Sequence, residues 1–491
     1  MRRALQSLTL ASLLLTGLVS RQASAQDAGA EQPQPAAAPQ PARTEPPPAD
    51  ATSKPSALAA APLPPLTKPK FGDTTTRGYF RGGFGASNQK GRQTCFSLPL
   101  EGGMLSKYRL GNECEVWAEM EFKTVVYAGD DGSVASVHFM PTAFIPTSQI
   151  GYPPTGVTSS DLGSPGTGAT VAFPNLYADI KGIPWLFGGT AWVGTRYYKR
   201  ESVYISDFFY WNPSGVGGGI EDVNLGENLR LSYGAFAVDG QPNGSPQLPM
   251  RVDLGIRHDL QLRGIKPYAA GELQLGFQFI QDWSGTKDDN SGLPLQRVTH
   301  GGYGGTLQWV HKLLGGDNKL AVQYGRGGGT GFGTLSRFYY PDFSLYFIPT
   351  EYRFRIVDVL TIQPTASFGA QVGLVYQHDD LGNAGQKTDW YSAGTRLSWG
   401  FTEHAKLLGE AGFDRVKKSN GSDPQFLAKF TVAPALAAAK GFWARPELRA
   451  FYTWAMWNET ARGATIDSGR LYTTSQLLSG ATFGLQAEAM W

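Results

Sequence analysis

The sequence has no apolar stretch after residue 26 that approaches the roughly 20 residues of a membrane-spanning helix. It is also poor in charge, because only 17% of its 491 residues are Asp, Glu, Lys or Arg and the formal net charge is +2. Nucleic-acid-binding proteins carry a strongly basic surface, which this balance excludes. We therefore expect neither a helical membrane protein nor a nucleic-acid partner.

Residue patterns that hold metals or perform catalysis are scarce as well. The six histidines are too far apart in sequence to form a local metal-ligand pair. Neither a G-x-S-x-G nucleophile elbow nor a P-loop occurs. A His and a Ser brought together from distant strands, as in outer-membrane lipases, stay open as an alternative. We otherwise expect no enzyme, no catalytic residue, no metal site and no cofactor.

The first 70 residues have the composition of a targeting segment followed by a spacer. A positive start is followed by an apolar core from Leu8 to Val19 and by a small-residue cleavage site before Gln26. This pattern predicts a cleaved signal peptide over residues 1–25 and an exported mature protein. Residues 26–70 are rich in Pro and Ala and cannot bury a core, so we expect a disordered tether there.

Cysteine is almost absent, with only Cys95 and Cys114 in the whole chain. In an exported protein, one even pair predicts a single disulfide bond. Closing a loop of this length stabilises a fold by about 3 kcal/mol in the chain-entropy model.

Glycine and aromatic residues are abundant, with 62 glycines and 12% aromatics, which is typical of many short strands joined by turns. Apolar and polar residues alternate with a period of two over 116–122, 391–401 and 482–491. Both soluble sandwiches and membrane barrels contain such strands. An exported chain without helical spans can cross lipid only as a closed barrel. Residues 71–491 accommodate about sixteen to eighteen strands at roughly 10 residues per strand plus turns and loops.

The segment 196–226 combines seven aromatic residues with Arg196, Arg200 and Asp207, and then runs into three consecutive glycines. Aromatic faces stack on the apolar faces of sugar rings, while Arg and Asp can hydrogen-bond sugar hydroxyls. The alternative interpretation is an ordinary amphipathic strand. The composition alone leaves both open.

The order of residues in this segment resembles the constriction-loop region of the maltoporin (LamB-type) family, outer-membrane channels for maltose and maltodextrins. Three further blocks are similar to the family's first hairpin and last strands: GYFRGGFG at 78–85 with KYRLGNECEVWAE at 107–119, FWARPELRAFYTWAMWNE at 442–459, and TFGLQAEAMW at 482–491. The resemblance implies an all-β fold: a transmembrane antiparallel barrel of about 18 strands over 71–491, with an inward-folded constriction loop. It also implies a homotrimer in outer-membrane lipid and a periplasmic N-terminal tether.

Part of the family's aromatic slide, which guides the apolar edge of a glucan, has matching positions here. Tyr79, Trp117 and Trp443 match members of the slide, and the strand period places Tyr79 and Trp117 on the polar, pore-facing side. Phe209 occupies the constriction position that is Tyr in maltoporins. Met490 falls where the family has Trp, which weakens the last position of the slide.

The sugar-hydroxyl ligands of the family also match in part, at Arg81, Arg109, Glu119, Arg200 and Asp207. An Arg suits this role because its fixed fork of donors can bridge adjacent hydroxyls. A solvated charge on the barrel interior is the alternative for each of them. Cys95 and Cys114 match the cysteines that staple the family's first external loop.

Three further family ligands are replaced, since Ser202 and Asn212 stand for Asp and Pro174 stands for Arg. The resemblance therefore implies facilitated diffusion of maltose, maltodextrins or related oligosaccharides, with the preferred sugar left open. A general diffusion porin, or a structural or adhesive barrel without sugar specificity, is the alternative function.

Overall fold

The computed structural model describes residues 69–99, 105–146, 170–240, 253–282, 301–332, 351–380, 387–462 and 476–491. The predicted signal peptide over 1–25 and nearly all of the predicted tether over 26–70 lie outside the described residues. No helix in the described part of the chain is long and apolar enough to cross a membrane.

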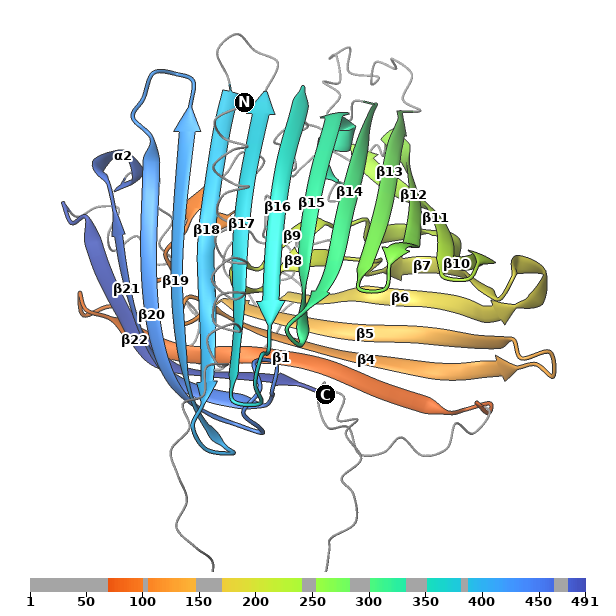
Figure 1. Ribbon diagram of the computed structural model, residues 1–491, viewed down its shortest axis with the longest axis horizontal. Coiled ribbons are helices and arrows are strands. Elements are labelled where there is room, and N and C mark those ends of the chain that lie inside the picture. Colours follow the sequence, from red (N-terminus) through yellow and green to blue (C-terminus); the bar gives the residue numbers. More distant parts are fainter. Residues whose placement is uncertain are drawn as a thin grey trace, which may run out of the picture. The chain divides into compact units, whose positions relative to one another are not determined.

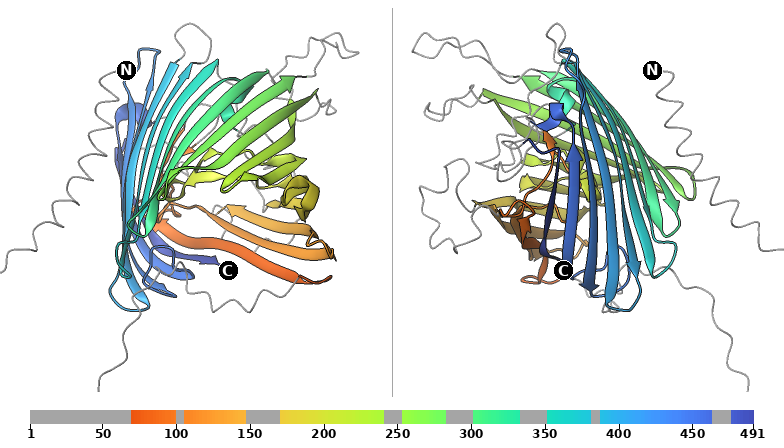
Figure 2. Two further views of the ribbon diagram at one scale, coloured as in Figure 1. Left: turned by 45° about the vertical axis from the view of Figure 1, so that its right-hand side comes forward. Right: turned by 90° about the vertical axis from the view of Figure 1, so that its left-hand side faces the viewer.

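The described chain forms a closed antiparallel barrel of 18 strands (Figures 1 and 2). Each strand pairs with the next one in the barrel, and β1 pairs with both β4 and β22, which closes the sheet. This confirms the predicted fold. The strands are β1 (Thr74–Ser87), β4 (Glu115–Ala128), β5 (Val134–Pro146), β6 (Thr170–Ile183), β7 (Gly189–Arg196), β10 (Gly215–Gly226), β11 (Leu229–Gly240), β12 (Asp253–Tyr268), β13 (Gly271–Asp282), β14 (Gly302–Leu313), β15 (Gly316–Gly327), β16 (Tyr352–Ile362), β17 (Phe368–Asp380), β18 (Lys387–Gly400), β19 (Ala405–Lys418), β20 (Gln425–Ala437), β21 (Glu447–Trp457) and β22 (Ser479–Met490).

Short elements lie in the connections between these strands. They are β2 (Leu98–Pro99), β3 (Leu105–Ser106), β8 (Glu201–Val203), β9 (Phe208–Trp211), the 3₁₀ turns η3 (Pro184–Leu186), η4 (Tyr204–Ser206) and η5 (Gly328–Gly331), and α2 (Glu459–Arg462). We call the end of the barrel where β1 begins and β22 ends the terminal end, and the opposite end the loop end. The connections at the terminal end are the shorter ones.

Alternating residues separate an apolar outer face from a polar inner face, as the period of two predicts. On β18, Leu397 and Trp399 are exposed on the outside, whereas Arg396 and Ser398 are buried on the inside. The predicted strand over 391–401 ends at Gly400, because Phe401 already belongs to the following turn. An apolar outer face is what a barrel in lipid requires.

Two connections from the loop end fold into the barrel. We call the described residues 88–99 and 105–114 the inner loop and residues 197–214, which contain β8, η4 and β9, the constriction loop. Phe96 and Tyr108 of the inner loop share a buried cluster with Ile205 and Tyr210 of the constriction loop. The same cluster includes wall residues of β15–β21, such as Trp390. The two loops and this part of the wall thus form one hydrophobic core inside the barrel.

Candidate functional site

The constriction loop is fixed to the barrel wall by polar side chains of the inner face. Arg355 on β16 and Gln323 on β15 donate hydrogen bonds to the carbonyl of Tyr210 at 3.2 and 3.0 Å. Arg257 on β12 donates to the carbonyls of Pro213 and Ser214. Because buried carbonyls need partners, these contacts hold the loop at a defined depth.

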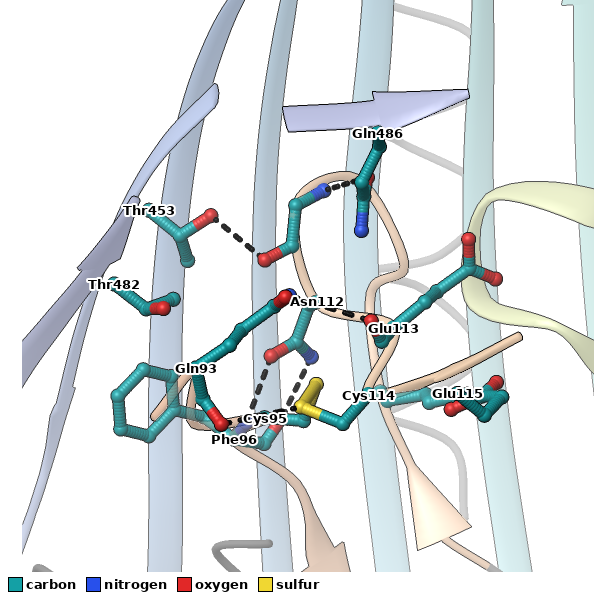
Figure 3. Close-up of a disulfide and its surroundings, with 12 residues drawn as sticks. Gln93, Cys95, Phe96, Asn112, Glu113, Cys114, Glu115, Thr453, Thr482 and Gln486 are labelled. Carbon is teal, nitrogen blue, oxygen red and sulfur yellow. Dashed lines mark hydrogen bonds and ion pairs between the residues drawn. A yellow bond between two sulfur atoms is a disulfide. The ribbon is translucent and has the colours of Figure 1, made fainter. Parts of the chain in front are cut away.

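The inner loop is closed at its base by the Cys95–Cys114 disulfide, which confirms the predicted bond (Figure 3). Within the ring, the Asn112 amide accepts a hydrogen bond from the Phe96 N–H at 2.7 Å and donates one to the Phe96 carbonyl at 2.9 Å. Gln486 on β22 accepts from the Gly111 N–H at 3.3 Å. The loop is therefore tied to itself and to the last strand.

The segment of the inner loop that carries Tyr108 and Leu110 packs against the wall of β18–β20. The Tyr108 ring lies on β18 and β19, where a Cβ at Gly394 or Gly412 would overlap it. The neighbouring Leu110 is buried in a cluster with Leu408, and its carbonyl accepts a hydrogen bond from Lys429 at 3.1 Å. Glycine at two wall positions thus makes room for one aromatic side chain.

Three of the predicted polar-track residues are brought together between the two loops. Arg81 pairs with Glu113 of the inner loop at 2.8 Å, with Glu115 on β4 at 2.7 Å and with Asp207 of the constriction loop at 3.2 Å. Arg109 pairs with Glu113 at 2.7 Å and is 4% exposed, while Arg81 is 8% exposed. Arg81, Arg109 and Asp207 therefore form a buried ionic network that joins the loops to the wall.

Asp207 is the member of this network that the constriction loop supplies. Burial would raise the pKa of its carboxyl, but the positive charges of Arg81, Arg109 and Lys107 outweigh burial and lower the pKa below its ordinary value. Its backbone is left-handed, with φ of 54°, directly after the η4 turn. The carboxylate is thus held ionised and aimed back at the wall.

Tyr79 and Trp117 lie on the inner face of neighbouring strands. Trp117 stands opposite Arg81 in the register of β1 and β4, with the Arg81 guanidinium 5.8 Å from its ring, and donates to Glu119 at 2.8 Å. Tyr79 stands opposite Glu119 on one side and opposite Met490 on the other. The predicted slide residues Tyr79, Trp117 and Met490 therefore lie close together, on the same face as Arg81 and Glu119.

Arg200 and Phe209 contact each other within the constriction loop. The Arg200 guanidinium lies 3.4 Å from the centre of the Tyr197 ring and 4.9 Å from that of the Phe209 ring. Tyr197 in turn donates its hydroxyl hydrogen to Glu119 at 3.3 Å. Glu119 thus links the wall to the constriction loop through Tyr197.

Trp443 lies apart from these residues, in the connection between β20 and β21 at the terminal end. Its ring meets the edge of Tyr204 at a centroid distance of 4.7 Å. Tyr204 donates to Glu488 at 2.7 Å and accepts a hydrogen bond from Arg445 at 2.7 Å. Trp443 is 38% exposed, and the constriction loop reaches it through Tyr204.

Sequence reasoning missed Tyr204 and Phe144 as members of this site. Phe144 lies opposite Trp117 on the inner face of β5, with ring centres 6.0 Å apart. The period of two in β5 could have assigned Phe144 to the inner face. For Tyr204, the aromatic composition of 196–226 indicates no specific role, because its hydrogen-bond partners come from the last 50 residues of the chain.

The substituted family positions have separate surroundings. Asn212 accepts hydrogen bonds from Ser214 within a local turn, the closer from its hydroxyl at 2.6 Å. Ser202 pairs with Phe209 in the small β8–β9 sheet, and Pro174 is buried on β6. Among the described residues, no group of three or more His, Cys, Asp or Glu is placed to hold a metal ion.

Comparison with known proteins agrees with this geometry. A family model described as LamB porin matches residues 74–491, so the chain belongs to the LamB porin family. It is accordingly an outer-membrane β-barrel channel.

Solved structures with similar barrels include OmpT of Vibrio cholerae in a trimer form, with 10% identity, a TM-score of 0.40 and coverage of 86% of this chain and 100% of that chain. Pseudomonas aeruginosa OpdQ has 10% identity, a TM-score of 0.46 and coverage of 85% and 99%. P. aeruginosa OpdK, solved with vanillate, has 11% identity, a TM-score of 0.44 and coverage of 85% and 98%.

Proposed function

We propose that this LamB-family porin carries oligosaccharides, such as maltose and maltodextrins, across the outer membrane by facilitated diffusion. The observation that supports this most directly is the pairing of aromatic rings with charged groups on the inner face. Trp117 is flanked by Arg81 and Glu119, and Tyr79 lies beside Glu119 and Arg109. Rings of this kind contact the apolar face of a sugar, while their polar neighbours contact its hydroxyls.

In this mechanism a sugar passes Trp117 and Phe209, then Tyr79 and Met490, and leaves past Trp443. Each contact has to be weak, because a solute that binds strongly at one position does not move to the next. Transport is passive and saturable, with no enzymatic step.

The polar track has two parts with different tasks. Glu119 and Arg200 offer hydrogen-bonding groups to sugar hydroxyls beside the rings. Arg81 already donates to Asp207, and Arg109 already donates to Glu113. These residues therefore hold the inner loop and the constriction loop in place, and they exchange with sugar hydroxyls only when a bond of the network opens.

The alternative is a general diffusion porin, or a structural or adhesive barrel, without sugar specificity. Such a barrel has no need for Tyr79 and Trp117 on its polar inner face. A bilayer experiment separates the two functions. The channel is inserted into a planar membrane, and maltodextrins of increasing length are added while the ion current is recorded. We expect a concentration-dependent block; a current that no sugar alters would contradict the proposal.

We further propose a homotrimer that is exported by a cleaved signal peptide over 1–25 and carries residues 26–70 in the periplasm. The barrel leaves no unpaired strand edge, so it should resist detergent until heated. Membrane fractionation and gel mobility of unboiled samples test this assembly. Mass determination of the mature chain tests the cleavage site.

A further inference from the structure

The Arg200 side chain combines two features that no other arginine of the two loops shares. Its guanidinium lies over the rings of both Tyr197 and Phe209, at 3.4 and 4.9 Å from their centres. A guanidinium that contacts aromatic rings still has five N–H donors to offer to an acceptor. Among the described residues, none of these N–H groups is given to a carboxylate or to any other acceptor.

Three other arginines around the passage are paired with carboxylates. Arg81 pairs with three carboxylates, Arg109 with Glu113, and Arg196 with Glu221 at 3.0 Å. Arg200 is therefore set apart by its missing partner rather than by its residue type.

Two carboxylates of the constriction loop and of the adjacent wall, Glu201 and Glu119, have partners of their own. Glu201, its neighbour in sequence, pairs with Arg263 at 3.1 Å and with Lys319 at 2.9 Å. Glu119 accepts hydrogen bonds from Trp117 and Tyr197. Glu201 thus balances only one of the two positive charges that it contacts.

A second cation without a carboxylate lies behind the constriction loop. Arg355 is fully buried beside the Phe208 ring, 5.0 Å from its centre, and donates to Gln377, Gln323 and the Tyr210 carbonyl. No carboxylate among the described residues pairs with it. In a region of low dielectric this charge is poorly screened, so it adds to the positive potential at the loop.

We propose that Arg200 is a carboxylate-binding subsite, so that the channel prefers acidic oligosaccharides, which carry uronic acid residues, over neutral ones of the same length. The fixed fork of a guanidinium binds a carboxylate through two parallel hydrogen bonds. Phe209 beside it offers an apolar face to the same sugar ring. This inference rests on the proposed function as an oligosaccharide channel and names its substrate class.

The test compares two trisaccharides, trigalacturonate and maltotriose, as blockers of the ion current at neutral pH in planar bilayers. A charge-assisted hydrogen-bond pair should make trigalacturonate bind about tenfold or more tightly than maltotriose. The advantage should shrink as the KCl concentration rises, because salt screens the ionic contribution. Block by maltotriose should hardly depend on salt.

Variants then assign the preference to Arg200. Arg200→Gln should lower the affinity for trigalacturonate about tenfold or more and leave that for maltotriose changed much less. Arg200→Lys keeps the charge but not the fork and should retain part of the preference. Arg415→Gln, on the outer face of β19 beside Tyr391, is the control and should change neither affinity.

The outcomes separate this inference from the proposed function. Block by maltotriose that equals or exceeds block by trigalacturonate overturns the inference and leaves the sugar channel standing. A preference for trigalacturonate that survives Arg200→Gln also overturns the assignment to Arg200. If neither sugar blocks the current, both the inference and the proposed function are wrong.

Discussion

Tyr204 donates its phenolic hydrogen to the Glu488 carboxylate at 2.7 Å, which joins the constriction loop to the strand that closes the barrel. The same hydroxyl accepts a hydrogen bond from Arg445 at 2.7 Å, in the connection that carries Trp443. Arg109 of the inner loop covers the Tyr204 ring, with its guanidinium 4.8 Å from the centre. One side chain therefore connects the two loops, the last strand and the exit side of the passage.

We expect Tyr204→Phe to disturb the exit side selectively. The variant keeps the ring but loses two hydrogen bonds to charged groups, each worth about 1.5–3 kcal/mol. Trp443 should lose its fixed position, so sugar added from the terminal end should block the current more weakly than sugar added from the loop end. Tyr452→Phe, on the exposed outer face of β21, is the matched control. Equal weakening from both sides would show that Tyr204 has no local role.

Substitution of two glycines on β19 tests whether the space beside Gly412 is needed to hold the Tyr108 ring. Gly412→Ala places a Cβ in the Tyr108 ring, whereas at Gly409 nothing lies within 4 Å of the added Cβ. We expect Gly412→Ala to displace Tyr108 and the inner-loop residues around it, at an overpacking cost of about 1–3 kcal/mol in stability. The displaced loop should increase the noise of the open-channel current. Gly409→Ala should behave like the parent channel. Equal current noise in the two variants would contradict a role of Gly412 in holding Tyr108.

The strand faces could be predicted from sequence because each depends on a local period of two. In β4, the alternation over 116–122 predicts Trp117 and Glu119 on one face and Met120 on the other, and the structure agrees. The inner loop could not be placed in the same way. Its position depends on contacts such as Tyr108 with Ser392 at 2.8 Å, which join residues 284 positions apart. No local pattern encodes a contact of that range.

Substitution of Trp117 measures how much an aromatic ring on the inner face contributes to sugar affinity. Trp117→Ala removes the ring that lies between Arg81 and Phe144. We expect sugar affinity in the bilayer assay to fall about tenfold, since one aromatic contact and its area are worth on the order of 1–2 kcal/mol. Trp399→Ala removes a ring that is 55% exposed on the outer face and should leave sugar affinity unchanged. Sugar affinity that falls equally in both variants would point to a general loss of barrel integrity.

The candidate site was predictable at its wall and less so at its loops. Tyr79, Trp117 and Glu119 follow from the strand period together with the family resemblance. The ion pairing of Arg81, Arg109 and Asp207 could not be predicted from the sequence, because a sequence shows which residues are charged but not which of them pair. Only the folded chain places Arg81 within 3.2 Å of Asp207, with Arg81 buried and Asp207 partly buried. Because they are paired, these residues hold the inner loop and the constriction loop against the wall.

The Arg81–Asp207 bridge predicts how the channel responds to acid. Positive neighbours outweigh burial and lower the folded-state pKa of Asp207. The carboxylate therefore stays ionised below the ordinary Asp pKa of about 3.9, and the bridge is lost only as the pH falls through the lower, folded-state pKa. We expect conductance and current noise to be constant from neutral pH to about pH 4 and to change below it.

Asp207→Asn reproduces the protonated state at every pH and so assigns the acid transition to this residue. At neutral pH the variant should already show the noisier current that the parent channel shows in acid, and its own acid transition should be smaller. Asp222→Asn, which removes an exposed partner of Lys199 at 2.7 Å, is the control because it lies outside the Arg81 network. A parent transition centred at or above the ordinary Asp pKa would contradict a lowered pKa. An unchanged transition in Asp207→Asn would assign it to another carboxylate.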